Sequence, residues 1–205
     1  MKILDGKNLS SHILDETRHK VESLRKQGMT PGLATILIGD DPASHVYVGQ
    51  KIKKCETIGI KSFHRPLPSN ISQKEVFSTL AELNSDPHVH GIILQLPIPK
   101  HLDSEQLISA MDPKKDADGL HPLNQGMMAR LKTWEDLQRS GIPLPCTPAG
   151  VIHMLLREKI PVAGKTAVVV GRSPLVGKPL GQLLLSLDAT VTMAHSKTKN
   201  LHYSL

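Results

Sequence analysis

Four polar residues in the first 120 positions could together form a small-molecule site. Tyr47 and Lys51 are four residues apart in a segment with helical spacing, so their side chains share one helix face. A lysine removed from water can exchange protons near neutral pH, and an aromatic ring can stack on a flat ligand. Gln95 interrupts an apolar run and could hold that lysine in place. Asp118 could accept hydrogen bonds from a ring that carries amino and N–H groups.

Each of these residues also has an ordinary structural interpretation. A tyrosine and a lysine four residues apart usually mark a solvated helix face, and Lys54 is too close to Lys51 for spacing to choose between them. Gln95 could be a core amide with satisfied hydrogen bonds. Asp118 could be only a turn residue before Gly119. The spacing of these residues leaves both interpretations open.

Alternating strand and helix patterns would position these four residues. Short aliphatic runs predict buried strands over 33–39 and 91–97, and a further strand is predicted over 60–67. Helical spacing and capping signals predict helices over 9–24, 43–58, 72–84 and 103–111. This alternation is typical of parallel βαβ units, in which ligands bind beyond the carboxyl ends of the strands. The expected fold class is therefore α/β, with an N-terminal parallel-sheet αβα catalytic domain.

The second half of the chain carries a candidate phosphate-binding turn. Strands are predicted over 166–171 and 190–195, with helices over 149–159 and from the glycine turn to 187. The segment from Gly171 to Gly177 follows a strand and opens a helix, so its backbone amides could cradle a pyrophosphate. Its spacing differs from the G-x-G-x-x-G pattern, and an ordinary strand-to-helix turn is the alternative.

Composition narrows the classes of partner. The chain has 205 residues with a formal net charge of +6, which suits an anionic ligand, while 2% aromatic residues argue against base-stacking platforms for nucleic acid. Cys55 and Cys146 have no paired spacing and indicate reduced thiols, and His88 and His90 have no evident third ligand, so no metal is expected. No apolar run approaches the length of a membrane-spanning helix, which is roughly 20 residues. We therefore expect a cytoplasmic protein with no membrane partner.

Several segments resemble the signature stretches of one enzyme family, in the same order along the chain. They are Pro-Ala-Ser-His-Val-Tyr-Val-Gly-Gln-Lys (42–51), Gly-Ile-Ile-Leu-Gln-Leu-Pro-Ile-Pro (91–99), Pro-Lys-Lys-Asp-Ala-Asp-Gly-Leu-His-Pro-Leu-Asn (113–124), Pro-Cys-Thr-Pro-Ala-Gly (145–150) and Gly-Arg-Ser-Pro-Leu-Val-Gly-Lys-Pro (171–179). On these segments the chain resembles the bifunctional methylenetetrahydrofolate dehydrogenase/methenyltetrahydrofolate cyclohydrolase family, over essentially residues 1–200.

The resemblance implies an activity in one-carbon folate metabolism that supports purine biosynthesis. The family oxidises 5,10-methylenetetrahydrofolate with NADP and hydrolyses the methenyl product to 10-formyltetrahydrofolate. By resemblance, Tyr47 stacks on the folate, Lys51 is the essential lysine of the cyclohydrolase step, and Gln95 tunes and positions it. Asp118 anchors the pterin ring. The pocket wall and the remaining substrate contacts are implied for Leu96, Pro97 and Pro99.

The resemblance also implies an NADP site and a domain organisation. The implied cofactor-binding residues are Gly171, Arg172, Ser173, Val176, Gly177, His195, Ser196 and Lys197. We expect a folate-binding catalytic domain over 1–119 and an incomplete Rossmann-type NADP-binding domain over 120–205, through which family members commonly form homodimers. Family members continue with further strands and a glycine-rich segment, so we expect a truncated chain of doubtful activity. The alternative is a non-catalytic fragment that binds folate or a subunit.

Overall fold

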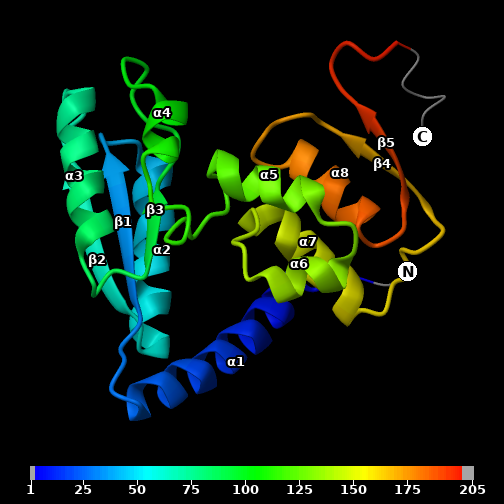
Figure 1. Ribbon diagram of the computed structural model, residues 1–205, viewed down its shortest axis with the longest axis horizontal. Coiled ribbons are helices and arrows are strands. Elements are labelled where there is room, and N and C mark those ends of the chain that lie inside the picture. The colour runs from blue at the N-terminus through cyan, green and yellow to red at the C-terminus, as the bar shows by residue number, and fades with distance from the viewer. Residues whose placement is uncertain (1–2, 200–205) are drawn as a thin grey trace. The chain divides into compact units, whose positions relative to one another are not determined.

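A computed structural model describes residues 3–199 of the chain (Figure 1). The chain divides into two compact units. The N-terminal unit comprises residues Lys7–Ala117, and the C-terminal unit comprises Asp118–Leu205 together with Met1–Gly6. The last six residues of the predicted NADP-binding domain, 200–205, lie outside the described residues.

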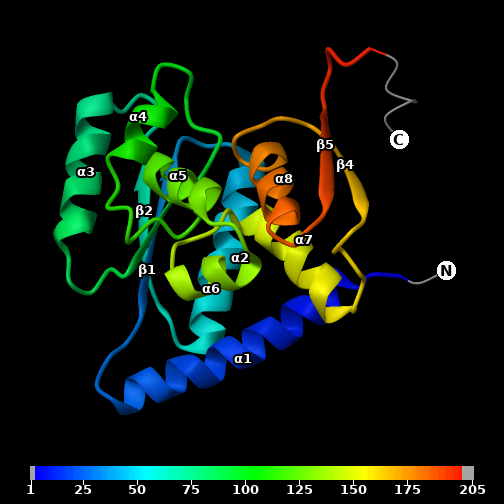
Figure 2. The same cartoon turned by 45° about the vertical axis from the view of Figure 1, so that its right-hand side comes forward.

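The N-terminal unit is built on a three-stranded parallel sheet. The strands are β1 (Gly32–Ile38), β2 (Lys61–Leu67) and β3 (Gly91–Leu94), in the order β2-β1-β3. The helices are α1 (Gly6–Lys26), α2 (Pro42–Ile58), α3 (Gln73–Ser85) and α4 (Ser104–Ser109). Helices α2 and α3 lie on opposite sides of the sheet, as Figures 1 and 2 both show. The α/β fold class expected from the sequence is confirmed.

Local sequence signals explain the bounds of these elements. Gly59 has a left-handed φ of 83° and ends α2, as its place in the sequence predicts. Ser72 and Glu75 form the predicted capping box at the start of α3. The middle strand β1 is an unbroken apolar run apart from Thr35 because both of its faces are covered. The largest fully buried side chains around it include Ile36, Leu37, Leu80, Leu83, Ile92 and Leu107.

The C-terminal unit contains a two-stranded parallel sheet with helices. Its elements are α5 (Pro122–Arg130), α6 (Trp134–Ser140), α7 (Cys146–Arg157), β4 (Thr166–Val170), α8 (Gly177–Leu185) and β5 (Thr190–Ala194). Strands β4 and β5 pair in parallel, and α8 packs against both of them (Figure 1). A core cluster that includes Met128, Trp134, Ile152 and Leu183 joins this sheet to helices α5 to α8.

The structure differs from the sequence-based expectation at the end of one strand, at the start of one helix and in two further helices. Strand β3 ends at Leu94, so Gln95 follows the strand instead of lying within it. Helix α7 begins at Cys146, three residues before the expected start, because Pro148 falls in the first helical turn, where its missing N–H costs no hydrogen bond. Helices α5 and α6 were not predicted at all.

Candidate active site

The start of α2 is fixed by an aspartate directly after β1. The carboxylate of Asp41 accepts hydrogen bonds from the Ser44 hydroxyl at 2.7 Å and from the Ser44 backbone N–H at 2.8 Å. These two hydrogen bonds, the hydroxyl bond first, hold the pKa of Asp41 below its ordinary value. With Pro42 as the first helical residue, the cap sets where the helix begins. Tyr47 and Lys51 therefore project from the first turns of a helix that starts at the carboxyl end of β1.

One hydrogen bond joins the helix to the sheet edge. The Lys51 Nζ donates to Gln95 Oε1 over 3.1 Å, and both side chains are half-buried. Gln95 is itself held on two sides: its backbone N–H donates to Ile36 O at 2.9 Å and its Nε2 donates to Leu96 O at 2.7 Å. The amide oxygen is thereby turned toward the lysine. The structure brings together Lys51 and Gln95 and gives Lys54 an exposed position instead.

Tyr47 and Cys55 lie one helical turn on either side of Lys51. The Tyr47 side chain is 60% exposed and leaves its ring available to a flat ligand. Cys55 is buried, and desolvation, with a smaller contribution from Glu56, raises the pKa of its thiol. The face of α2 near Lys51 thus passes from an open aromatic ring to a buried thiol within two turns.

The segment before Asp118 is anchored at the edge of β3. Ile92 N–H donates to Lys115 O at 2.6 Å, Ala117 N–H donates to Ile92 O at 3.1 Å, and Asp116 forms a parallel bridge with Ile92. Asp118 follows this bridge by two residues and is half-buried. Its expected role as the pterin anchor stays a prediction.

In the C-terminal unit, a tight glycine loop connects β4 to α8. Gly171 has φ of +147°, and a Cβ on Gly177 would lie 2.5 Å from Gly171 O. Inside the loop, Ser173 Oγ accepts hydrogen bonds from the N–H groups of Val176 at 3.1 Å and Gly177 at 3.3 Å. The Arg172 side chain is exposed beside it. The loop therefore has a fixed backbone that opens directly onto a helix N-terminus.

A second turn follows the neighbouring strand β5. His195 N–H donates to Thr198 Oγ1 at 2.8 Å, and Lys197 N–H donates to His195 Nδ1 at 3.1 Å. Ser196 and Lys197 are exposed on this turn. Gly171 N–H donates to Ala194 O at 2.8 Å, so both turns begin at the same pair of strand ends.

Comparison with known proteins identifies the family of the chain. The model of the tetrahydrofolate dehydrogenase/cyclohydrolase catalytic domain matches residues 4–118, and the model of that family's NAD(P)-binding domain matches residues 145–205. The chain belongs to this family. The resemblance found in the sequence is thereby confirmed.

Relatives in the tetrahydrofolate dehydrogenase/cyclohydrolase family are similar over nearly the whole chain. A bifunctional protein FolD from Acetivibrio thermocellus is 47% identical over 98% of this chain and 67% of its own length. The crystal structure of the bifunctional FolD from Campylobacter jejuni has a TM-score of 0.94 at 42% identity, covering all of this chain and 70% of that one. A Trypanosoma brucei FolD, complexed with NADP and an inhibitor, has a TM-score of 0.88 at 34% identity, covering 98% of this chain and 67% of that one. The chain thus spans about two thirds of the length of these relatives.

The glycine loop lies within the segment that matches the family's NAD(P)-binding domain. The missing Cβ of Gly177 lets the backbone of Gly171 and Arg172 pack directly against the start of α8. Arg172 and Lys197 are exposed cations beyond adjacent strand ends. Among residues 3–199, no group of three or more His, Cys, Asp and Glu side chains could hold a metal ion. No helix of the described part is long and apolar enough to cross a membrane.

Sequence reasoning missed two residues that support the site of this family member. Asp41 was not among the predicted site residues, although Asp-Pro before a helical pattern is a recognisable N-terminal signal. Lys115 donates from Nζ to Leu83 O at 3.0 Å, Asn84 O at 2.7 Å and Asp86 O at 2.9 Å. It thereby ties the end of α3 to the segment that precedes Asp118. No local pattern could have found it, since its partners lie about thirty residues earlier.

Proposed function

We propose that this chain carries the two activities of its family. The first is NADP-dependent oxidation of 5,10-methylenetetrahydrofolate to 5,10-methenyltetrahydrofolate, and the second is hydrolysis of that product to 10-formyltetrahydrofolate. The observation that carries the proposal is the 3.1 Å hydrogen bond from Lys51 Nζ to Gln95 Oε1 at the carboxyl edge of a parallel sheet. A half-buried lysine whose position is fixed by an amide can act as a positioned proton-transfer group.

In this proposal each residue has one role. Tyr47 stacks its exposed ring on the folate, and Asp118 accepts hydrogen bonds from the pterin. Lys51 moves or holds the proton exchanged when water adds to the methenyl carbon and the bridging C–N bond breaks. Gln95 positions Lys51, while Leu96 and Pro97 form part of the pocket wall.

The cofactor site is proposed for the C-terminal unit. NADP, when bound, supplies the acceptor for the hydride that leaves the methylene carbon. Gly171, Ser173, Val176 and Gly177 would shape the loop that receives its pyrophosphate at the start of α8. The 2′-phosphate of NADP is assigned to two exposed cations, Arg172 after β4 and Lys197 after β5. His195 and Ser196, which precede Lys197 on its turn, complete this part of the proposed site.

We propose residues 1–119 as the folate-binding catalytic domain and 120–205 as the NADP-binding domain. The family matches over 4–118 and 145–205 support this division. We further propose a cytoplasmic enzyme that serves purine biosynthesis and binds neither nucleic acid nor membranes. Association into a homodimer through the second domain is supported by exposed apolar side chains there, such as Val170 and Leu185.

The direct test follows both reactions by absorbance. The purified chain is mixed with methylenetetrahydrofolate and NADP, and in a second assay with methenyltetrahydrofolate alone. Lys51→Met should lower the hydrolysis rate by at least about 100-fold, the usual contribution of a positioned proton-transfer group. Lys20→Met, which removes an exposed charge from α1, should retain the full rate. Folate binding without turnover in the unchanged chain would instead support the non-catalytic alternative.

A further inference from the structure

Asn84, near the end of α3, makes two side-chain hydrogen bonds that have no role in the proposed reaction so far. Its Nδ2 donates to Ala110 O at 2.8 Å, and its Oδ1 accepts from the Asp112 backbone N–H at 2.8 Å. Ala110 ends α4, and Asp112 begins the segment that leads to Asp118. The half-buried amide of Asn84 therefore joins the end of α4 and the start of that segment to α3.

The segment over 112–117 is a turn followed by one pairing with the sheet. Asp112 accepts a hydrogen bond from Lys114 N–H through Oδ1 at 2.9 Å, and from Lys115 N–H through its carbonyl at 2.8 Å. Beyond the turn, within residues 3–199, the segment pairs with β3 through an isolated bridge at Ile92 instead of a full strand. The direction in which the chain leaves this bridge therefore also depends on what holds the turn.

Asn84 holds the turn at its other end as well. The Asn84 carbonyl accepts a hydrogen bond from Lys115 Nζ at 2.7 Å, and the same ammonium donates to Leu83 O and Asp86 O. The side chain of Asn84 thus contacts the start of the turn, and its backbone contacts the end. Because these contacts join positions 26 to 31 residues apart, they fix where the turn lies relative to α3.

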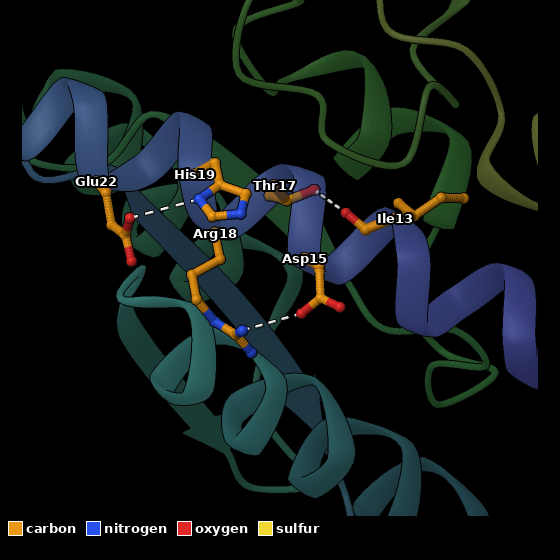
Figure 3. A network of polar contacts seen from close by, with 6 residues as sticks. All are labelled: Ile13, Asp15, Thr17, Arg18, His19 and Glu22. Carbon is orange, nitrogen blue, oxygen red and sulfur yellow. Dashed lines mark hydrogen bonds and ion pairs between the residues drawn. The ribbon is translucent and has the colours of Figure 1, made fainter.

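The polar contacts on α1 are of a different kind. Figure 3 shows the ion pair of Asp15 with Arg18 at 2.9 Å and the hydrogen bond from Thr17 Oγ1 to Ile13 O at 2.7 Å. Each joins residues three or four positions apart on the surface of one helix, so neither sets the position of another segment. The contacts of Asn84 are partly buried and connect different elements, as a positioning role requires.

We propose that Asn84 is a positioning residue for folate binding, because it fixes the turn at Asp112 and thereby the carboxylate of Asp118. The inference rests on the proposed function, in which Asp118 accepts hydrogen bonds from the pterin. Ala117 N–H donates to Ile92 O at 3.1 Å and Asp118 follows directly, so a shift of the turn is passed on to the Asp118 backbone. A displacement of about 1 Å is enough to weaken such an anchor strongly. Asn84 touches no ligand in this role.

The test measures the Kd of tetrahydrofolate by calorimetry, and kcat and KM for the hydrolysis of methenyltetrahydrofolate. Asn84→Ala should raise Kd and KM roughly tenfold and change kcat by less than about twofold, because Lys51 and Gln95 keep their hydrogen bond. The matched control is Val76→Ala, which removes buried methyl groups from the same helix. It should lower stability and leave Kd, KM and kcat within about twofold of their original values.

A double-mutant cycle with Asp118→Ala separates positioning from a general loss of stability. If Asn84 acts through Asp118, Asn84→Ala should raise Kd by less than about twofold in a chain that already carries Asp118→Ala. Lys115→Met, which releases the other end of the turn, should follow the same pattern. This second variant decides the question if Asn84→Ala does not fold.

Every contrary outcome overturns the inference. An unchanged Kd in a folded Asn84→Ala chain would show that the segment keeps its place without the amide. The same weakening with and without the Asp118 carboxylate, or in Val76→Ala, would show an effect of stability alone. An unchanged Kd in Asp118→Ala would remove the anchor, while the rate loss expected for Lys51→Met would still support the proposed function. If the unchanged chain binds no folate, the proposed function fails and the inference fails with it.

Discussion

The two candidate ligand sites are built by different physical means. In the N-terminal unit, Lys51 and Gln95 come from different elements and are held by a hydrogen bond between their side chains. In the C-terminal unit, the loop before α8 is shaped by its own backbone, with Ser173 bonding N–H groups three and four residues ahead. The first site therefore depends on the packing of helix against sheet. The second depends on the absence of side chains at Gly171 and Gly177.

The sheets beneath the two sites also differ, in how deeply their strands are buried. Strand β1 is the middle of three, and its residues from Ala34 to Ile38 are all buried. Within residues 3–199, strand β4 pairs only with β5, and Val170 at its end is 60% exposed. Packing defects should thus be costly under the first site and mild under the second.

The largest expected effect comes from the centre of β1. Ile36→Ala should lower the free energy of unfolding of the N-terminal unit by about 2–5 kcal/mol, because the fully buried side chain leaves a cavity. Val170→Ala should change stability by less than about 0.5 kcal/mol, since that side chain is mostly exposed. Denaturant unfolding combined with hydrogen exchange of peptides from β1 and β4 measures both. Similar costs for the two variants would contradict the comparison.

The glycine loop between β4 and α8 should be sensitive to an added side chain, whereas β1 is sensitive to a removed one. In Gly177→Ala the new methyl would lie 2.5 Å from Gly171 O, so the backbone must shift, at a cost of about 1–3 kcal/mol. If the loop binds NADP, its affinity should fall roughly tenfold to a hundredfold. Gly126→Ala, in α5, meets nothing within 4 Å and should leave the affinity unchanged. Titration of each variant with NADP gives the values, and an unaltered affinity in Gly177→Ala would remove the loop from the cofactor site.

Local signals made the frame of the N-terminal unit predictable. The capping box at Ser72, the left-handed Gly59 and the apolar run of β1 each act within a few residues, so sequence spacing reveals them. The choice of Lys51 over Lys54 was different. It depends on Gln95, which is 44 positions away, and no periodicity on α2 contains that information.

The missed helices have weak local signals. Helix α6 is seven residues long, and α5 is nine residues long with His121 as its cap, a residue type that is not among the preferred ones. Their stability comes from burying Met128, Trp134 and Leu137 in a core shared with α7 and α8. Such tertiary burial overrides propensity, which is why pattern alone did not find them.

A smaller loss of stability should show that Lys115 is a structural residue and not a catalytic one. Lys115 lies in a signature stretch of the family, yet its Nζ bonds three carbonyls at and just beyond the end of α3. Lys115→Met should lower the free energy of unfolding by about 2 kcal/mol, because those carbonyls lose charged donors. The exposed neighbour is the control, and Lys114→Met should stay within about 0.5 kcal/mol. A Lys115→Met protein of full stability would contradict the structural role.

The smallest effect concerns the thiol one turn beyond Lys51. Burial raises the pKa of Cys55, so the folded state keeps its proton at a pH where the unfolded chain, with an ordinary thiol pKa near 8.5, loses it. The stabilising contribution is therefore full below about pH 8.5 and falls as the pH rises through the raised pKa, by at most about 1.4 kcal/mol per pH unit. Denaturant unfolding between pH 7 and 9.5 measures this slope, and Cys55→Ala should remove it. The exposed Cys146 should react with a thiol reagent at neutral pH while Cys55 reacts only on unfolding, and equal rates would show that α2 does not pack on the sheet as described.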